Sequence, residues 1–277
     1  MLDILMTDIA FGESPRWHDG RLWFADWAAG ELIALTPHGD HEVVARVNSF
    51  PFCFDWLPGG SLLAVNSREK RLLRLEPSGS AETHADLAAL SEKPWNEIVV
   101  DARGNAYVNC IGFDFPAGEP GPGFVALVTP DAEIRRVADD VAFPNGMAIL
   151  PDETTLVVAE SYASRLTAFD IEHDGSLANR RVWAEVDGPP DGICADADGA
   201  VWYADVPNRR CRRVVEGGEI LDTVELDRGC FACMLGGDDG RTLFVVGQEW
   251  RGPSATSSER SGVVAATRAP APHAGRP

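Results

Sequence analysis

The chain of 277 residues is poor in basic residues and in long apolar segments, and each shortage excludes a class of protein. Only 24 Lys and Arg stand against 43 Asp and Glu, a formal net charge of −19 that repels phosphate backbones, so we expect no nucleic-acid partner. The stretch MLDILMTDIAFGESP has no basic region and is interrupted by Asp3, Thr7 and Asp8, unlike a signal peptide. No apolar run approaches the ~20 residues of a membrane-spanning helix. We therefore expect a cytoplasmic protein without a membrane partner.

Metal motifs built from histidine and cysteine are also missing. The 6 histidines form no HExxH motif and no pair at ligand spacing. Cys230-Phe-Ala-Cys233 is a C-x-x-C pair, but a zinc site of this kind would need a second pair. We expect the 6 cysteines to be reduced, and Cys230 and Cys233 to pack in the core. Because they are three positions apart, a regular strand would point them to opposite faces.

What the sequence does contain is a unit of roughly 40–50 residues that recurs six times. Each copy has an apolar strand, a Gly/Asp turn, a second strand ending near an acidic or small residue, and a third strand ending at another turn. The copies are recognised from Trp17, Leu57, Asp101, Leu150, Asp196 and Gly236 onward. Such a unit is typical of a β-propeller blade, which buries its faces only against neighbouring blades. The sequence therefore predicts an all-β, six-bladed β-propeller that occupies residues 1–277 as a single domain.

The predicted strands also indicate how the ring closes. They fall within 13–46, 52–86, 96–138, 145–185, 191–225 and 231–267, and the last of these blades is one strand short. The segment at residues 3–8 precedes the first blade and has nothing to pair with. Since closed β architectures avoid exposed sheet edges, residues 3–8 should pair near 262–267 and complete the last blade. A Gly/Pro-rich insertion at 111–123 should form either a lid or a surface loop.

Four oxygen-bearing side chains occupy one position in different repeats, near the start of the first strand: Glu13, Asn96, Asn145 and Asp191. Because the first strands should line the central channel in one direction, these side chains should ring one mouth of it. Buried carboxylates without partners are costly, and a cation relieves that cost. Oxygen ligands suit Ca²⁺, Mg²⁺ or Mn²⁺, with Zn²⁺ as a further option. The alternative, that Asn-Gly and Asp-Gly merely form turns, does not account for Glu13 or Asn96.

The segments GESPRW, PWNEIVVDARGNAYV, FPNGMAILPD and PPDGICADADGAVWYAD resemble the four signature segments of the gluconolactonase/regucalcin (senescence marker protein, SGL) family. The resemblance implies a six-bladed propeller with one divalent ion, for which we expect Ca²⁺, with Zn²⁺, Mn²⁺ or Mg²⁺ as alternatives. It further implies that Glu13, Asn145 and Asp191 bind the metal and that Asn96 contacts the substrate or a metal-bound water.

The chain departs from this family beside Asn96. Sugar-lactonase members often have an arginine two residues before the asparagine, where this chain has Pro94. The substrate therefore need not be a sugar-acid lactone, and Trp95 is expected to offer an apolar wall. Glu97 keeps the acidic residue that usually follows the asparagine. We accordingly expect Asn96, Trp95 and Glu97 to bind the substrate.

These observations predict a metal-dependent lactonase, a carboxylic ester hydrolase acting on a small molecule. The ion would polarise the carbonyl and Asp191 would serve as the general base toward water. Two alternatives stay open: an organophosphate-ester hydrolase using the same metal site, and a non-catalytic calcium- or ligand-binding propeller. An open coordination position facing solvent would favour an enzyme over a binding module.

Overall fold

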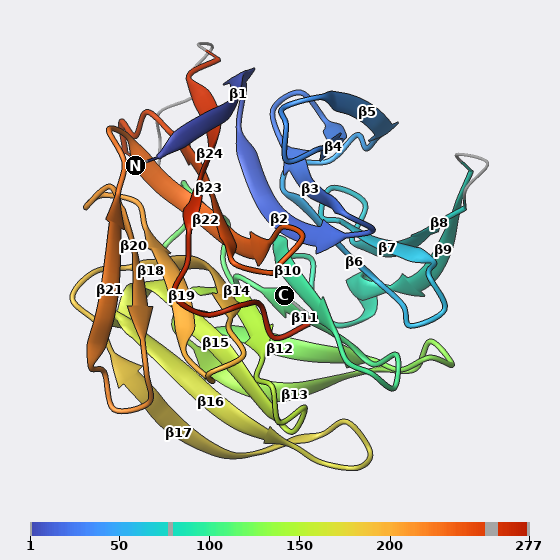
Figure 1. The fold of residues 1–277 in the computed structure, drawn as a ribbon. Coiled ribbons are helices and arrows are strands. Elements are labelled where there is room, and N and C mark those ends of the chain that lie inside the picture. Colours follow the sequence, from blue (N-terminus) through green and yellow to red (C-terminus); the bar gives the residue numbers. More distant parts are fainter. Residues whose placement is uncertain (1, 77–79, 253–259, 276–277) are drawn as a thin grey trace.

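The computed structural model describes residues 2–76, 80–252 and 260–275. Its strands form six four-stranded sheets arranged as blades around a ring (Figure 1). Within the described residues the only helices are two short 3₁₀ turns, at Leu87–Ala89 and Ser161–Ala163, and no helix is long and apolar enough to cross a membrane. The predicted six-bladed β-propeller is therefore confirmed.

Each of blades 1 to 5 uses consecutive strands from the innermost to the outermost. Blade 1 has β2 (Gly12–His18), β3 (Arg21–Asp26), β4 (Glu31–Leu35) and β5 (His41–Arg46), and blade 2 has β6 (Phe52–Trp56), β7 (Leu62–Asn66), β8 (Arg71–Leu75) and β9 (Ala81–Asp86). Blade 3 has β10 (Trp95–Val100), β11 (Ala106–Cys110), β12 (Gly123–Val128) and β13 (Ile134–Val141), and blade 4 has β14 (Pro144–Ile149), β15 (Thr155–Glu160), β16 (Arg165–Ile171) and β17 (Leu177–Glu185). Blade 5 has β18 (Pro190–Ala195), β19 (Val201–Asp205), β20 (Arg210–Val214) and β21 (Ile220–Glu225).

Blade 6 is built from both ends of the chain. It combines β22 (Gly229–Gly236), β23 (Thr242–Gln248) and β24 (Gly262–Arg268) with the N-terminal strand β1 (Asp3–Ile9), in the order β1-β24-β23-β22. The antiparallel register runs from Asp3 opposite Ala266 to Ile9 opposite Gly262. The predicted closure by residues 3–8 is therefore confirmed.

The core lies between the blades and explains the sequence pattern of the strands. All residues of β10, β15 and β22 are buried, because neighbouring blades cover both faces of these strands. Apart from Asn96, Glu97, Thr155 and Glu160, their sequences are accordingly apolar or small rather than alternating. The outermost strands β5 and β21 are mainly exposed and carry the polar side chains.

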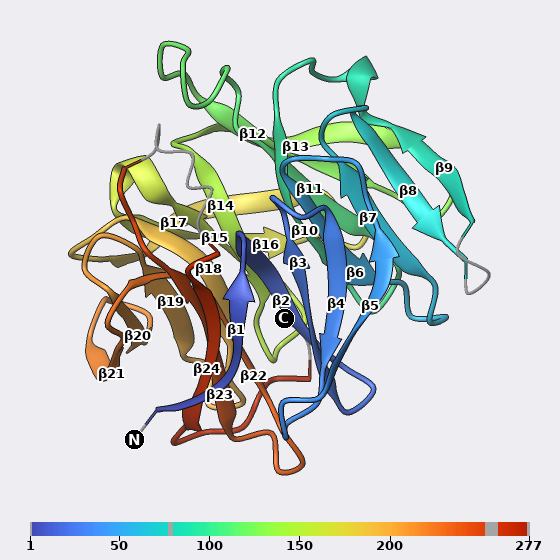
Figure 2. The same cartoon turned by 90° about the horizontal axis from the view of Figure 1, so that it is seen from above.

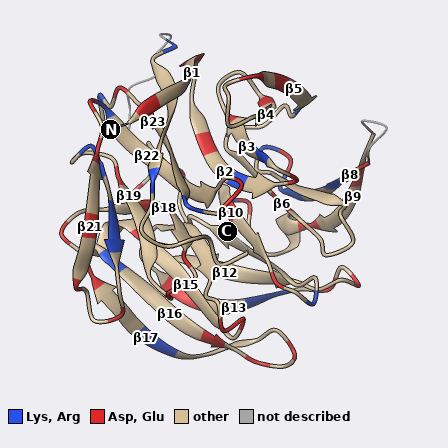
Figure 3. Cartoon of the chain, viewed as in Figure 1, with Lys and Arg blue, Asp and Glu red and all other residues tan. Residues whose placement is uncertain are grey.

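The two ends of the central channel differ. The C-terminal segment crosses the end where the innermost strands finish: the N–H of Ala197 donates to the Pro272 carbonyl (2.8 Å), and the N–H of His273 donates to the Gly240 carbonyl (2.9 Å). Figure 1 views this end, with the C-terminus near the centre of the ring. The opposite end, where the innermost strands begin, is the mouth, and it faces the top of Figure 2. Acidic residues are spread over all six blades rather than collected on one face (Figure 3).

Candidate metal centre at the channel mouth

Four innermost strands each place a polar side chain at the mouth in the same way. Each is the second residue of an innermost strand: Glu13 in β2, Asn96 in β10, Asn145 in β14 and Asp191 in β18. In all four strands the pairing with the next strand is interrupted at this point by a register shift. Such β-bulges re-aim side chains and are common beside functional sites. The innermost strand of blade 2, β6, pairs without a shift and carries apolar residues here.

Contacts among these side chains show that they meet. The Nδ2 of Asn96 donates to the Oδ1 of Asn145, at 3.3 Å, and also to the Pro144 carbonyl. Asn145 in turn forms a hydrogen bond with Asp191. The carboxylates of Glu13 and Asp191 are close enough to repel each other. Residues from four blades are thus gathered into one site, as the shared register predicted; their roles in it stay predictions.

The electrostatics of this site are those of a carboxylate cluster without its counter-ion. Burial raises the pKa of Glu13 well above its usual range, and repulsion from Asp191 and Glu97 raises it further. Burial and the charge of Glu97 raise the pKa of Asp191 to about 8, although the hydrogen bond with Asn145 opposes this shift. Both groups therefore favour a proton or a cation beside them.

The donor set fits a hard divalent cation. Two carboxylates and an amide oxygen are the oxygen ligands that Ca²⁺ takes, and a 2+ charge would relieve the repulsion between Glu13 and Asp191. No group of three or more His, Cys, Asp or Glu in the described part of the chain could by itself hold a metal, so the set depends on the amide of Asn145. Glu13 is buried, whereas Asn145 and Asp191 keep partial exposure, which leaves the site open toward solvent.

A buried arginine, which the sequence analysis did not single out, lies below these donors. The guanidinium of Arg16 on β2 forms an ion pair with Glu97 on β10, with Nη2 2.9 Å from Oε1. The same nitrogen donates to the Ile98 carbonyl (2.6 Å), and the Oγ of Ser14 donates to the other carboxylate oxygen of Glu97 (3.3 Å). Glu97 is thus held from two sides and is almost fully buried.

Two further residues position Asn145: Asn109, which the sequence did not single out, and Ser161, for which it favoured a packing or loop role. The Nδ2 of Asn109 donates to the backbone carbonyl of Asn145 (2.6 Å), and its Oδ1 accepts from the N–H of Glu97 (3.2 Å). The Oγ of Ser161 accepts from the Nδ2 of Asn145 (3.3 Å) and donates to the Pro190 carbonyl in the next blade (2.7 Å). Asn109 and Ser161 lie at or just after the ends of second strands, the point in each repeat where acidic or small residues recur. This recurrence was the sequence signal that could have identified Asn109 and Ser161 as site residues.

The predicted wall residue Trp95 does not face the mouth. Its side chain is completely buried, packs edge-on against Phe124 (5.4 Å between ring centroids) and donates its indole N–H to the Ser91 carbonyl. Trp95 therefore offers no surface to a substrate, because its side chain packs into the core between blades 2 and 3. The carboxylate of Glu97, the third residue predicted to bind the substrate, forms an ion pair with Arg16 instead.

The cysteine pair is also placed differently from the expectation. Cys230 and Cys233 are free and buried, as predicted, but they do not face opposite ways. Both form thiol contacts with Cys211 and belong to one core cluster. The register shift in β22 between Cys230 and Ala232 breaks the alternation on which the expectation rested.

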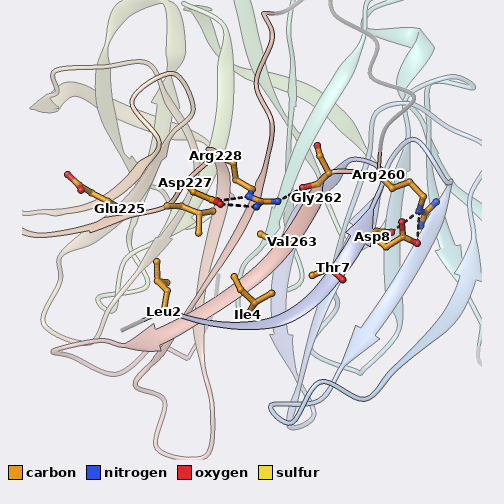
Figure 4. A pocket seen from close by; sticks show the side chains of 12 residues that line it. Leu2, Ile4, Thr7, Asp8, Glu225, Asp227, Arg228, Arg260, Gly262 and Val263 are labelled. Carbon is orange, nitrogen blue, oxygen red and sulfur yellow. Dashed lines mark hydrogen bonds and ion pairs between the residues drawn. The ribbon is translucent and has the colours of Figure 1, made fainter.

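A separate pocket of about 390 Å³ lies on the outer side of blade 6, where β1 and the start of β24 meet the segment after β21 (Figure 4). Its two arginines are each paired with an aspartate: Arg228 with Asp227 (2.6 Å) and Arg260 with Asp8 (3.3 Å). None of the four mouth residues lines it.

Comparisons with known proteins agree with the fold. The 6-deoxy-6-sulfogluconolactonase of Pseudomonas putida is 25% identical over 96% of this chain and 94% of its own length. Regucalcin of Oryctolagus cuniculus is 30% identical over 87% of this chain and 84% of its own length. The crystal structure of a calcium-binding protein, regucalcin, from Agrobacterium tumefaciens superposes with a TM-score of 0.80 at 20% identity, covering 99% of this chain and 94% of that one. The family model described as the SMP-30/gluconolactonase/LRE-like region matches residues 11–248, a span that contains all four mouth residues. The chain belongs to the SMP-30/gluconolactonase/LRE-like family.

Proposed function

We propose that this protein is a metal-dependent hydrolase of lactones. The observation that carries the proposal is the meeting of Glu13 and Asp191, two carboxylates without a counter-cation, with the amides of Asn96 and Asn145 at an open mouth. The lactonase name of the relative from Pseudomonas putida supports the same reaction class.

In this proposal Glu13, Asn145 and Asp191 hold one divalent ion, with Ca²⁺ the expected one. A bound divalent ion supplies Lewis-acid polarisation of the lactone carbonyl. Asn96 orients the substrate through its amide. The Asp191 carboxylate accepts a proton from the attacking water and returns it to the ring oxygen as the C–O bond breaks, giving the open hydroxy acid.

The partial exposure of Asn145 and Asp191 favours an enzyme over a binding propeller with a closed ligand shell. The test is hydrolysis of a panel of lactones by the chelator-treated protein, with and without Ca²⁺, Mn²⁺ or Zn²⁺. We expect turnover that is lost with EDTA and restored by one of these ions. Full activity after metal removal would contradict the proposal. Metal binding without turnover would indicate the non-catalytic alternative, and turnover of a phosphotriester alone would indicate the organophosphate hydrolase.

A further inference from the structure

Aromatic side chains crowd one side of the mouth. We call this group the Phe11 cluster; its members are Phe11, Trp27, Phe50, Phe231 and Trp250, from blades 1, 2 and 6. The ring of Phe11 lies 5.4 Å from that of Trp27, 5.8 Å from that of Phe50 and 5.2 Å from that of Phe231, which in turn lies 5.8 Å from Trp250. Phe50 is 59% exposed and Trp250 is 39% exposed. The cluster therefore presents open aromatic surface, an unusual feature for side chains of this size.

A second group, the Phe143 cluster, consists of Phe113, Phe115, Phe143 and Tyr162. The ring of Phe143 stacks on Tyr162 at 4.6 Å and meets Phe115 edge-on at 5.0 Å. Phe113 and Phe115 belong to the insertion between β11 and β12, which projects at the mouth end of the molecule (Figure 2). Tyr162 is 54% exposed. The insertion thus adds the rings of Phe113 and Phe115 to those of Phe143, just before β14, and Tyr162, just after β15.

Both clusters are tied to the candidate metal ligands. Phe11 precedes Glu13 by two residues, and its carbonyl accepts from the N–H of Trp27 (2.7 Å). Phe143 precedes Asn145 by two residues, and Tyr162 directly follows Ser161, whose Oγ accepts from Asn145. Blades 1 and 4 are opposite each other in a ring of six. The donor set is therefore flanked by aromatic rings on two sides.

Two cationic side chains close in sequence to the donors are paired with carboxylates. Arg16 is held by Glu97, and Lys93, which precedes Pro94, forms an ion pair with Asp114 (2.8 Å). The indole N–H of Trp27 donates to the Phe52 carbonyl. A sugar lactone would need partners for each hydroxyl that it buries, since an unpaired buried hydroxyl is costly. Apolar rings instead gain from covering apolar surface.

From these two walls we propose that the mouth takes lactones bearing aromatic or alkyl substituents, which pack against the exposed ring of Phe50 on one side or that of Tyr162 on the other. This inference rests on the proposed lactonase function and names the substrate class of the same site. The ester group lies at the donor set, and the substituent reaches the rim. Apolar contact with these rings then favours substituted lactones over polyhydroxylated ones.

The test compares a phenyl-substituted δ-lactone with glucono-δ-lactone, using the metal-loaded protein and the double variant Phe50→Ala/Tyr162→Ala. We expect the wild type to have a kcat/KM at least tenfold higher for the phenyl compound. The double variant should raise KM for that compound about tenfold and leave kcat within about twofold, the signature of lost uniform binding. The matched control is Val182→Ala/Ile220→Ala, two exposed apolar residues on the outer strands β17 and β21, which should change neither constant.

A binding arm separates this inference from the hydrolase proposal. A phenyl-substituted δ-lactam, which has no ester to cleave, is titrated by calorimetry into the wild type and into Phe50→Ala/Tyr162→Ala. The polyhydroxylated gluconolactam is the comparison probe. Tighter binding of the phenyl lactam by the wild type, weakened about tenfold in Phe50→Ala/Tyr162→Ala, supports the inference even if no lactone is turned over. Preference for gluconolactam, or equal binding of the phenyl lactam by both proteins, overturns it even if lactones are hydrolysed.

Discussion

Arg16 and Glu97 form an ion pair that crosses the channel just below the mouth, joining the innermost strands of blades 1 and 3 past the strand of blade 2. Both side chains are almost fully buried, and the Nε of Arg16 has no hydrogen-bond partner. Glu97 adds to the repulsion that raises the pKa values of Glu13 and Asp191. The pair therefore links the stability of the ring to the electrostatics of the site.

Breaking this pair from either side should destabilise the protein. Arg16→Met or Glu97→Gln leaves one buried charge uncompensated, which typically costs about 3–5 kcal/mol in the free energy of unfolding. The double variant Arg16→Met/Glu97→Gln should cost clearly less than the sum, because neither charge remains. Denaturant unfolding of the four proteins measures the coupling. Arg46→Met, which breaks the exposed pair of Arg46 with Glu31, serves as the control and should cost less than about 1 kcal/mol. Additive effects of the two buried substitutions would refute the coupling.

Asp191→Asn should separate the general base from the ligand. It retains an oxygen ligand of similar size but removes the basic carboxylate, so turnover should fall by roughly 10²-fold or more while the fold survives. Metal binding, measured by calorimetry, should weaken. Asn96→Ala should instead raise KM more than it lowers kcat. Near-normal turnover of Asp191→Asn at saturating metal would reassign the base to Glu13 or Glu97.

Ring closure through β1 can be tested with two isoleucines of the same strand. Ile9 is 0% exposed within the core and Ile4 is 51% exposed. Ile9→Ala should lower the free energy of unfolding by about 2–5 kcal/mol, and Ile4→Ala by no more than about 0.5 kcal/mol. Thermal unfolding of the wild type should show one cooperative transition, since residues 1–277 are proposed to form a single domain. Equal effects of the two substitutions would argue against a closing role for β1.

The pH dependence of stability should carry a signature of Asp55 on β6. Burial raises the pKa of its carboxyl to about 6 from an ordinary 3.8, despite the opposing charge of Arg16 and hydrogen bonds from the N–H groups of Trp56 and Val100. A raised folded-state pKa means that the stability contribution is present below pH ~4 and is lost as the pH rises through about 6. Asp55→Asn abolishes this loss. Its unfolding free energy relative to wild type should therefore increase by about 3 kcal/mol between pH 4 and pH 7, roughly two pKa units at 1.36 kcal/mol each. A difference that is constant with pH would contradict the assignment.

The ring and its closure were predictable because the information is local and repeated. Turn residues after each strand mark the blades, and the strand predicted to begin at residue 13 begins at Gly12. The unpaired segment at 3–8 follows from counting strands. The four mouth residues were predictable from their shared register. Their roles, the metal and the cytoplasmic location stay predictions.

What the sequence pattern could not supply depends on contacts between distant blades. Arg16 meets Glu97 across 81 positions of sequence, and Phe11 meets Phe231 across the closure of the ring. Register shifts also decide side-chain direction: at the shift in β10, Trp95 packs into the core while Asn96 lies at the mouth. The shift in β22 likewise lets Cys230 and Cys233 contact the same thiol, that of Cys211. Local alternation thus predicts side-chain direction only where the strand is regular.

The C-terminal segment that crosses the far end of the channel, together with the pairing of Asp3 with Ala266, leaves both ends of the described chain, Leu2 and Gly275, on the side away from the mouth. A bead, an electrode or a fusion partner attached at either terminus would therefore sit behind the ring. Tethered molecules would all present the same face to the bulk solution. The mouth of a molecule held from this side should therefore stay accessible to small molecules in solution.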